Sequence, residues 1–205
     1  TMTIIDSQVH AYEANTPQRP WLNKPNWPDH VTGDEMVAAM KKVGVDGAIF
    51  VSPFGLYGFD DSYAREVQQQ HPGSFAIVKP VDADDPAVAD VIAEWKKVPG
   101  AVGIRLGMAA DTGIAPDDPA VDRMLRAAAR HDMPVNFLCW GNLDAGTKVI
   151  DRHPDARFVI DDAHALHAPY LCRRCEPYQR KALAMAAHAV LLHPHVERST
   201  KLPRE

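Results

Sequence analysis

The feature that most constrains the fold is a regular alternation of short apolar segments with amphipathic segments. The apolar segments are nearly continuous, as is typical of parallel strands that are covered on both faces. The amphipathic segments have helical spacing, and two begin with paired aspartates followed by proline, a favourable helix start. We expect strands over residues 3–10, 46–53, 74–82, 101–108, 134–140 and 157–163. We expect helices over residues 32–43, 60–71, 86–97, 117–131 and 142–153.

Five successive strand–helix steps indicate an α/β protein with a parallel sheet. After the first connection, the expected strands start at regular intervals along the chain. Both a (β/α)8 barrel and a doubly wound sheet produce this rhythm. Residues 6–21 contain no glycine, which counts against the phosphate-binding loop of a dinucleotide-binding sheet. Polar residues stand instead at the carboxyl ends of strands, where a barrel builds its active site. The sequence therefore predicts a TIM-barrel-like (β/α)8 fold.

The length predicts that this barrel is incomplete. The chain has 205 residues, whereas a typical barrel uses about 250. We expect about six parallel strands in a barrel portion over residues 1–163, followed by a divergent helical tail over residues 164–205. The tail holds Cys172 and Cys175, which have the spacing of half a zinc site. It is interpreted either as the end of a truncated barrel or as a separate zinc-binding module.

Composition excludes several classes of partner. A net charge of −5 and a pI near 6.0 give no overall attraction to nucleic acid or to an anionic membrane. No apolar run approaches the length of a membrane span, and the N-terminal residues lack the pattern of a signal peptide. Three cysteines do not form a secreted disulfide framework. We therefore expect a cytoplasmic protein without a nucleic-acid or membrane partner.

The first expected strand presents a histidine beside a glutamine. Gln8 and His10 are two residues apart and share one face of an extended strand. Two histidines at this spacing would be a strong indication of a metal site. Only His10 offers an imidazole, so the pattern leaves three interpretations open: a metal enzyme with one exchanged ligand, a metal-free relative, or a scaffold without activity.

Charged and polar residues near other strand ends are candidates for substrate binding. Arg105 interrupts an apolar strand, and its planar guanidinium suits a carboxylate; a structural ion pair with Asp161 or Glu94 is the alternative. Lys79 interrupts a second strand in the same way, although a lysine there can also extend to solvent at the strand end. Asp161 is the candidate general base that activates water. Two further residues could line the pocket, namely Asn136 and Trp140.

Five segments carry a resemblance to a known family. In order, they read IIDSQVH, GVDGAIFVSP, PGAVGIRLGM, MPVNFLCWGNLD and HPDARFVIDD. Over about residues 2–162 the chain resembles the amidohydrolase-related (amidohydrolase 2) TIM barrels, which include metal-dependent hydrolases, sugar lactonases, a dicarboxylate lactonase and decarboxylases. The resemblance implies a hydrolase that acts on a small carboxylate or lactone, with arginines holding the substrate carboxylates.

The resemblance also implies where metal ligands would stand. The family usually opens with Asp-x-His-x-His, and Asp6, Gln8 and His10 occupy those places here. Leu138 and Asp162 stand where the family often has further histidines. The expected centre therefore reduces to His10 and Asp162, holding one zinc or manganese ion at a weakened site or no ion at all.

These observations give a leading hypothesis and its alternatives. In the leading hypothesis Arg105 anchors a small anionic substrate, Asp161 activates water, and His10 binds metal or polarises the carbonyl. The alternatives are a decarboxylase of the same family, a non-catalytic or truncated barrel remnant, and a zinc-dependent binding module built on the tail. An incomplete barrel would leave its first and sixth strands open, so we also expect a homo-oligomer.

Overall fold

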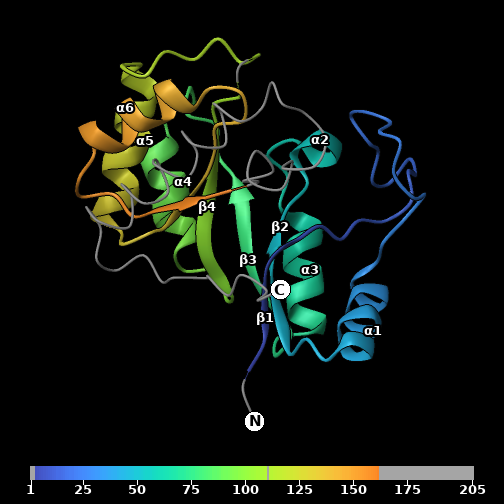
Figure 1. Cartoon of the computed structure of the whole chain (residues 1–205). Helices are drawn as coiled ribbons and strands as arrows, with labels where there is room; N and C mark the ends of the chain where they lie inside the picture. Colours follow the sequence, from blue (N-terminus) through green and yellow to red (C-terminus); the bar gives the residue numbers. More distant parts are fainter. Residues whose placement is uncertain (1–2, 110, 162–205) are drawn as a thin grey trace, which may run out of the picture. The chain divides into compact units, whose positions relative to one another are not determined.

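The computed structural model describes residues 3–109 and 111–161 (Figure 1). The sheet order follows the sequence order, and the register is parallel for β1–β2, β2–β3, β3–β4 and β5–β6. Successive parallel strands joined by helices are the arrangement of a (β/α) barrel, which confirms the predicted TIM-barrel-like fold with six strands. The strands are β1 (Ile5–Val9), β2 (Gly47–Val51), β3 (Phe75–Pro80), β4 (Ala101–Gly107), β5 (Val135–Leu138) and β6 (Phe158–Ile160).

Each of the five expected helices is present, with ends that differ from the expected ones by a few residues. The helix α2 (Phe54–Tyr57) was not expected, because so short a segment cannot show a helical period. The strands are also shorter than expected. The expected helices are α1 (Gly33–Val43), α3 (Ser62–Gln70), α4 (Val88–Trp95), α5 (Pro119–Arg130) and α6 (Leu143–Arg152).

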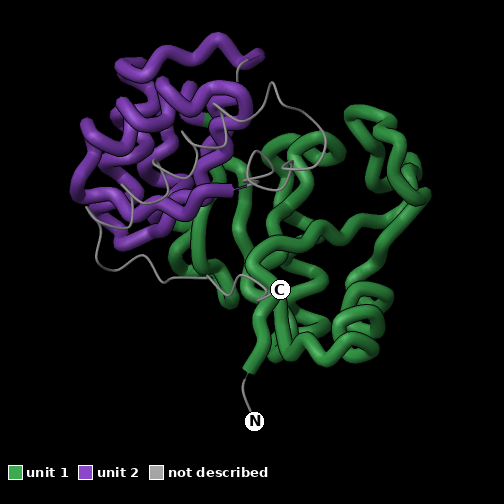
Figure 2. Tube along the Cα trace, viewed as in Figure 1, with its two compact units in different colours: residues 1–82, 94–105 green, residues 83–93, 106–205 purple. Residues whose placement is uncertain are grey.

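The chain divides into two compact units (Figure 2). Unit 1 comprises residues 1–82 and 94–105, and it contains β1 to β3, α1 to α3 and most of β4. Its core joins the sheet to α3 through aromatic side chains. The Phe50 ring lies 6.4 Å from the Tyr63 ring and 5.9 Å from the Phe75 ring, measured between centroids. These contacts identify the face of the β2–β3 sheet on which α3 packs.

Helix α1 has well-defined ends that follow from its sequence. The Thr32 side chain accepts a hydrogen bond from the backbone of Glu35, and the Glu35 carboxylate accepts one from the Thr32 backbone at 2.7 Å. This reciprocal pair is a capping box. The helix ends at Gly44, whose φ of 76° is left-handed, a conformation that glycine adopts without steric cost. Local chemistry therefore sets both limits of α1.

Unit 2 comprises residues 83–93 and 106–205, of which 83–93, 106–109 and 111–161 are described. Phe137 of β5 and Phe158 of β6 are fully buried, with ring centroids 5.6 Å apart. Helix α5 begins at Pro119, and the Asp118 side chain caps it by accepting a hydrogen bond from the Ala120 backbone at 2.8 Å. This cap confirms the helix start that the paired aspartates and proline predicted.

Several expectations fall on residues that the structure leaves out of its description. The boundary between a barrel portion and a tail at residues 163 and 164, the metal candidate Asp162 and the pair Cys172 and Cys175 all lie outside the described residues. In the part of the chain that is described, the helices are all too short or too polar to span a bilayer.

Candidate functional site

The strand register in unit 1 sorts the predicted site residues onto two faces of the sheet. Paired residues of parallel strands point to the same side, and successive residues alternate. Ile77 pairs with Phe50 and therefore shares the face on which α3 packs; Lys79, two residues on, lies on that face too. Pro80 pairs with Arg105, which places Arg105 on the opposite face.

His10 lies on the same face as Arg105. Its strand neighbour Val9 pairs with Phe50 on the helix-packed face, so the His10 and Gln8 side chains alternate to the other side. The His10 Nδ1 atom lies 2.7 Å from the Val51 carbonyl oxygen. A carbonyl oxygen can only accept, so Nδ1 carries a hydrogen, and in the neutral ring the lone pair belongs to Nε2. The β1–β2 pairing therefore determines which nitrogen of His10 can take part in chemistry.

An aromatic group from the loop after β1 covers His10. The Trp27 ring stacks on the His10 ring, with centroids 6.0 Å apart and an interplanar angle of 17°. Tyr12 lies against the Trp27 ring at 5.5 Å. Trp27 is 43% exposed, so part of its surface remains available beside the histidine. Sequence reasoning missed Trp27, although the run of aromatic residues Tyr12, Trp21 and Trp27 after a strand end was a usable signal.

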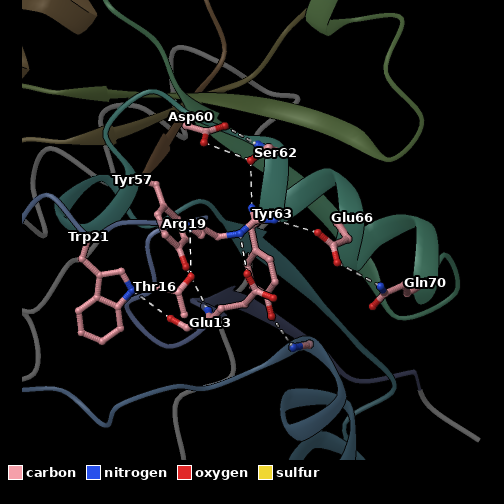
Figure 3. Close-up of polar contacts among 11 residues, drawn as sticks. Glu13, Thr16, Arg19, Trp21, Tyr57, Asp60, Ser62, Tyr63, Glu66 and Gln70 are labelled. Carbon is pink, nitrogen blue, oxygen red and sulfur yellow. Dashed lines mark hydrogen bonds and ion pairs between the residues drawn. The ribbon is translucent and has the colours of Figure 1, made fainter.

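Arg19 fastens this loop to helix α3 (Figure 3). Its guanidinium contacts the Glu13 carboxylate at 2.6 Å, the Glu66 carboxylate at 2.9 Å and the Ser62 hydroxyl at 2.9 Å. The guanidinium carbon also lies 4.8 Å from the centre of the Tyr63 ring, a cation–π contact. Arg19 thereby joins a segment of the loop to a helix that is distant in sequence.

Lys79 has a different environment from the one predicted. Its Nζ atom lies 3.1 Å from Asp61 Oδ2, and the two side chains are 13% and 12% exposed. The same ammonium group lies 5.3 Å from the centre of the Trp95 ring. Arg65 donates two further hydrogen bonds of 3.0 Å to Asp61. Because Lys79 is engaged on the helix-packed face, opposite the face of His10 and Arg105, we leave it out of the proposed site.

Arg105 is 7% exposed, near the carboxyl end of β4. Glu94, one of its two predicted ion-pair partners, contacts Lys97 at 2.6 Å. In unit 1 the residues that share a face at the strand ends are therefore Gln8, His10 and Arg105, with Trp27 stacked on the histidine.

Unit 2 presents a second pair of candidates on one face of its strands. Asn136 of β5 pairs with Val159 of β6, while Phe137 and Phe158 fill the opposite, buried face. Asp161 follows Val159 by two residues, so alternation places it on the same side as Asn136. Both residues are buried. Trp140 comes after β5 and is 66% exposed, which leaves it available for contact with a ligand.

The described donor atoms do not fit a complete metal centre. A catalytic zinc needs about three protein ligands, but residues 3–109 and 111–161 contain no group of three or more His, Cys, Asp or Glu side chains placed to share an ion. Gln8 offers an amide oxygen in place of an imidazole, and Leu138 has no donor atom in its side chain. We therefore derive no catalytic step through a metal ion.

With these features established, comparison with known proteins identifies the class. The amidohydrolase family model matches residues 5–197, so the chain belongs to the amidohydrolase family, and the family resemblance found in the sequence is confirmed. The match continues past residue 162, where that resemblance had ended. A comparison of the sequence with curated proteins found no match.

Solved structures show the same fold at low sequence identity. One is a probable 2-pyrone-4,6-dicarboxylic acid hydrolase from Acinetobacter baumannii with bound citric acid (TM-score 0.68, 17% identity, 90% of this chain and 66% of that chain). Another is a zinc-bound amidohydrolase from Burkholderia multivorans (TM-score 0.66, 20% identity, 90% of this chain and 67% of that one).

A third is a manganese-bound 5-carboxyvanillate decarboxylase from Novosphingobium aromaticivorans (TM-score 0.55, 14% identity, 76% of this chain and 64% of that one). The chain thus spans about two thirds of the length of these matched structures.

Proposed function

We propose that this chain is an amidohydrolase-family hydrolase that acts on a small carboxylate or lactone. The observation that carries the proposal is the arrangement in unit 1, where β1–β2 pairing orients His10 on the face that also carries Arg105. Barrel enzymes build their active sites at the carboxyl ends of strands, and both residues occupy such positions. Similarity to a 2-pyrone-4,6-dicarboxylic acid hydrolase supports a dicarboxylate lactone as the first substrate to test.

The proposed mechanism assigns one task to each residue. The Arg105 guanidinium binds a substrate carboxylate through two parallel hydrogen bonds. The sequence assigns the task of general base to Asp161, which would accept a proton from water as the water oxygen adds to a lactone carbonyl carbon. The bond from that carbon to the ring oxygen then breaks, and the ring oxygen takes the proton back from Asp161 as it leaves, which gives the ring-opened hydroxy acid. When His10 carries a second proton, its Nε2–H donates to the carbonyl oxygen, where negative charge develops during attack. The further residues that the sequence proposes for substrate contact are Gln8 in unit 1 and Asn136 and Trp140 in unit 2.

The test is hydrolysis of 2-pyrone-4,6-dicarboxylate, followed by loss of its ultraviolet absorbance. We expect Asp161→Asn to lower kcat by about a hundredfold or more, as removal of a general base does. Arg105→Lys keeps the charge but loses the planar fork, so we expect mainly a higher KM. Lys79→Met serves as the control, because it changes another strand-end cation of unit 1, one that lies on the opposite face; we expect little change in kcat or KM.

Full activity in Asp161→Asn would refute the proposed general base. Equal losses in Arg105→Lys and Lys79→Met would refute the anchoring role of Arg105, because of these two cations only Arg105 lies on the face of His10. If the wild-type chain hydrolyses no lactone in a panel of mono- and dicarboxylates, the non-catalytic interpretation replaces the hydrolase proposal.

A decarboxylase is the second candidate. Similarity to the 5-carboxyvanillate decarboxylase fold favours it, and an arginine that holds a carboxylate serves either reaction. The two candidates are separated by product analysis: a hydrolase opens the lactone without releasing gas, whereas a decarboxylase releases carbon dioxide from a carboxylated phenol.

We also propose a homo-oligomer. Strand β1 is the first strand of the described sheet and pairs there with β2. Ile5 of β1 is 53% exposed, and Ile4, which precedes the strand, is 44% exposed. An exposed apolar strand edge is a surface on which a second copy can pair. Light scattering after size-exclusion chromatography at micromolar concentration measures the mass, and a monomeric mass would contradict this proposal.

A further inference from the structure

Helix α5 carries three arginines along its exposed side. Arg123, Arg126 and Arg130 are separated by three and four residues, so they follow one another along one side of the helix. The other side of α5 is buried in unit 2. The stripe therefore gathers three positive charges on the surface of unit 2.

Two neighbouring hollows open beside this stripe and share Asp122 and Arg126. The larger has a volume of about 540 Å³ and lies between α5 and the connection from α6 to β6. The smaller, of about 360 Å³, extends along α5 to Arg130. We call the two hollows together the arginine groove. Its charged and titratable lining residues are Asp122, Arg123, Arg126, Arg130, Arg152, His153 and Asp155.

The Asp122 carboxylate is already engaged with the wall of the groove. Its Oδ1 atom lies 2.8 Å from His153 Nε2, and its Oδ2 atom accepts a hydrogen bond of 2.9 Å from Arg152 Nη2. Both carboxylate oxygens thus have donors within unit 2. This arrangement balances the negative charge of Asp122 and holds Arg152 at the groove.

The guanidinium N–H groups of Arg126, by contrast, make no hydrogen bond to Asp122. Its Nη2 atom lies 4.0 Å from Asp122 Oδ2, beyond hydrogen-bond distance. Among residues 3–109 and 111–161, neither Arg126 nor Arg130 has a hydrogen-bond acceptor within reach. Arg126 borders both hollows, so its guanidinium is the positively charged group that a ligand in either hollow can contact.

The charge balance of the groove determines the kind of ligand. The groove is lined by four arginines and by two carboxylates, those of Asp122 and Asp155. Its net charge is therefore +2 when His153 is counted as neutral. A planar guanidinium matches phosphate and carboxylate oxygens bidentately. The larger hollow also has the size of a small-molecule site.

We propose that the arginine groove binds a small oxyanion with two negative charges, either a phosphate group or a dicarboxylate. The site shares no residue with the strand-end residues proposed for catalysis. It would therefore bind its ligand whether or not the proposed hydrolase activity is correct.

Isothermal titration calorimetry on the full chain at pH 7.5 in low salt tests the proposal, with inorganic phosphate and succinate as separate probes. We expect saturable binding of at least one probe. Arg126→Ala should weaken it about tenfold, as expected when a hydrogen bond to a charged group is lost. Lys148→Ala removes one positive charge from α6 outside the groove, and we expect a change of less than about twofold.

Absence of saturable binding for both probes would overturn the proposal. Equal weakening in Arg126→Ala and Lys148→Ala would also overturn it, because the effect would then be one of net charge. Arg126→Lys distinguishes loss of the site from misfolding: it retains the charge, and we expect intermediate affinity with an unchanged circular dichroism spectrum. The stronger of the two probes identifies the source of the oxyanion.

Discussion

Lys79 and Arg105 are both charged residues that interrupt apolar strands, yet they lie on opposite faces of the sheet in unit 1. A buried ammonium group is costly unless it is paired. Asp61 supplies the partner of Lys79, and Trp95 adds a cation–π contact. The side chain of Lys79 therefore serves the packing of helices against strands.

This environment predicts a stability effect for Lys79→Met. We expect a loss of about 2 kcal/mol in the free energy of unfolding, because a largely buried ion pair is removed. We expect no larger loss, because the Asp61 carboxylate still accepts two hydrogen bonds from Arg65 in the variant. Urea titration measures it. Lys97→Met is the control: its pair with Glu94 is exposed. For this variant we expect a change of no more than about 0.5 kcal/mol. Equal effects in the two variants would contradict the assignment.

Cys139 gives a second prediction for a single residue. Burial raises the pKa of its thiol to about 11, so the reactive thiolate is scarce at neutral pH. In a Cys172→Ser, Cys175→Ser background, Ellman's reagent should react slowly with the native chain and rapidly after unfolding in urea. Rapid reaction of the native double variant would show that Cys139 is accessible.

For single residues, the sequence indicated which charged side chains stand on strands, but not which residues they contact in the folded chain. Alternation predicted that Gln8 and His10 share a face. It could not reveal that Lys79 and Arg105 differ, because that depends on the register of β3 against β2 and β4. Trp27 was missed because its contact with His10 depends on the path of a loop, which carries no periodic signal.

Among the elements, the loop over residues 11–32 depends on contacts distant in sequence. Arg19 joins it to α3 through Glu66 and Ser62 (Figure 3). We expect Arg19→Leu to expose this loop to proteolysis and to speed hydrogen exchange of the Tyr12 amide, which donates to the Val31 carbonyl at 2.7 Å. A matched Arg157→Leu variant, whose pair with Asp132 is in unit 2, should leave the loop protected. Similar cleavage in both variants would contradict the prediction.

The contacts of Asp122 on α5 with Arg152 and His153 at the end of α6 predict that the free energy of unfolding depends on pH. Partial desolvation raises the pKa of Asp122, but the His153 hydrogen bond and the Arg152 charge outweigh it and hold that pKa below its ordinary value. A lowered folded-state pKa contributes stability that is present above about pH 4 and is lost as the pH falls through the lowered pKa.

Asp122→Asn removes this contribution. We expect the variant to be less stable than wild type at pH 7, by about 1 kcal/mol, and the difference to shrink near pH 3. Urea unfolding at both pH values measures it, with Asp155→Asn as the control in the same groove. A difference that stays constant down to pH 3 would show that ionisation of Asp122 is not its source.

The elements themselves were largely predictable. Strands and helices alternate with distinct periods, and helix starts such as Asp118–Pro119 are set by local chemistry. The single-turn helix α2 escaped notice because its length gives no period. The Arg19 network escaped as well, since contacts between segments far apart in the chain leave no trace in a single sequence.

For the molecule as a whole, membership of the amidohydrolase family raises the question of metal. The donors among residues 3–109 and 111–161 form no three-ligand group, and the candidate ligand Asp162 lies outside those residues. Elemental analysis of chain purified without affinity metal measures whether an ion is present. If about one ion per chain is found, we expect it to disappear in His10→Ala and to persist in Cys172→Ser; the reverse result would place the ion in the C-terminal segment.

The fold class was accessible from the sequence because parallel strands, covered on both faces, leave a strong apolar signal. The homo-oligomer and the cytoplasmic location remain predictions. They depend on surfaces and cellular context that an apolar pattern does not encode.

The alternation along β3 has a consequence for laboratory evolution of this chain. Codons 77 and 79 specify side chains of the helix-packed face, whereas codons 78 and 80 specify side chains of the face that carries His10. A library randomised at codons 78 and 80 would search for new substrate preferences while the Lys79–Asp61 pair stays intact. Deleting a single codon within β3 would move the following side chains of the strand to the opposite face. The variant would then lose both the packing against the helices and the residues of the face that carries His10.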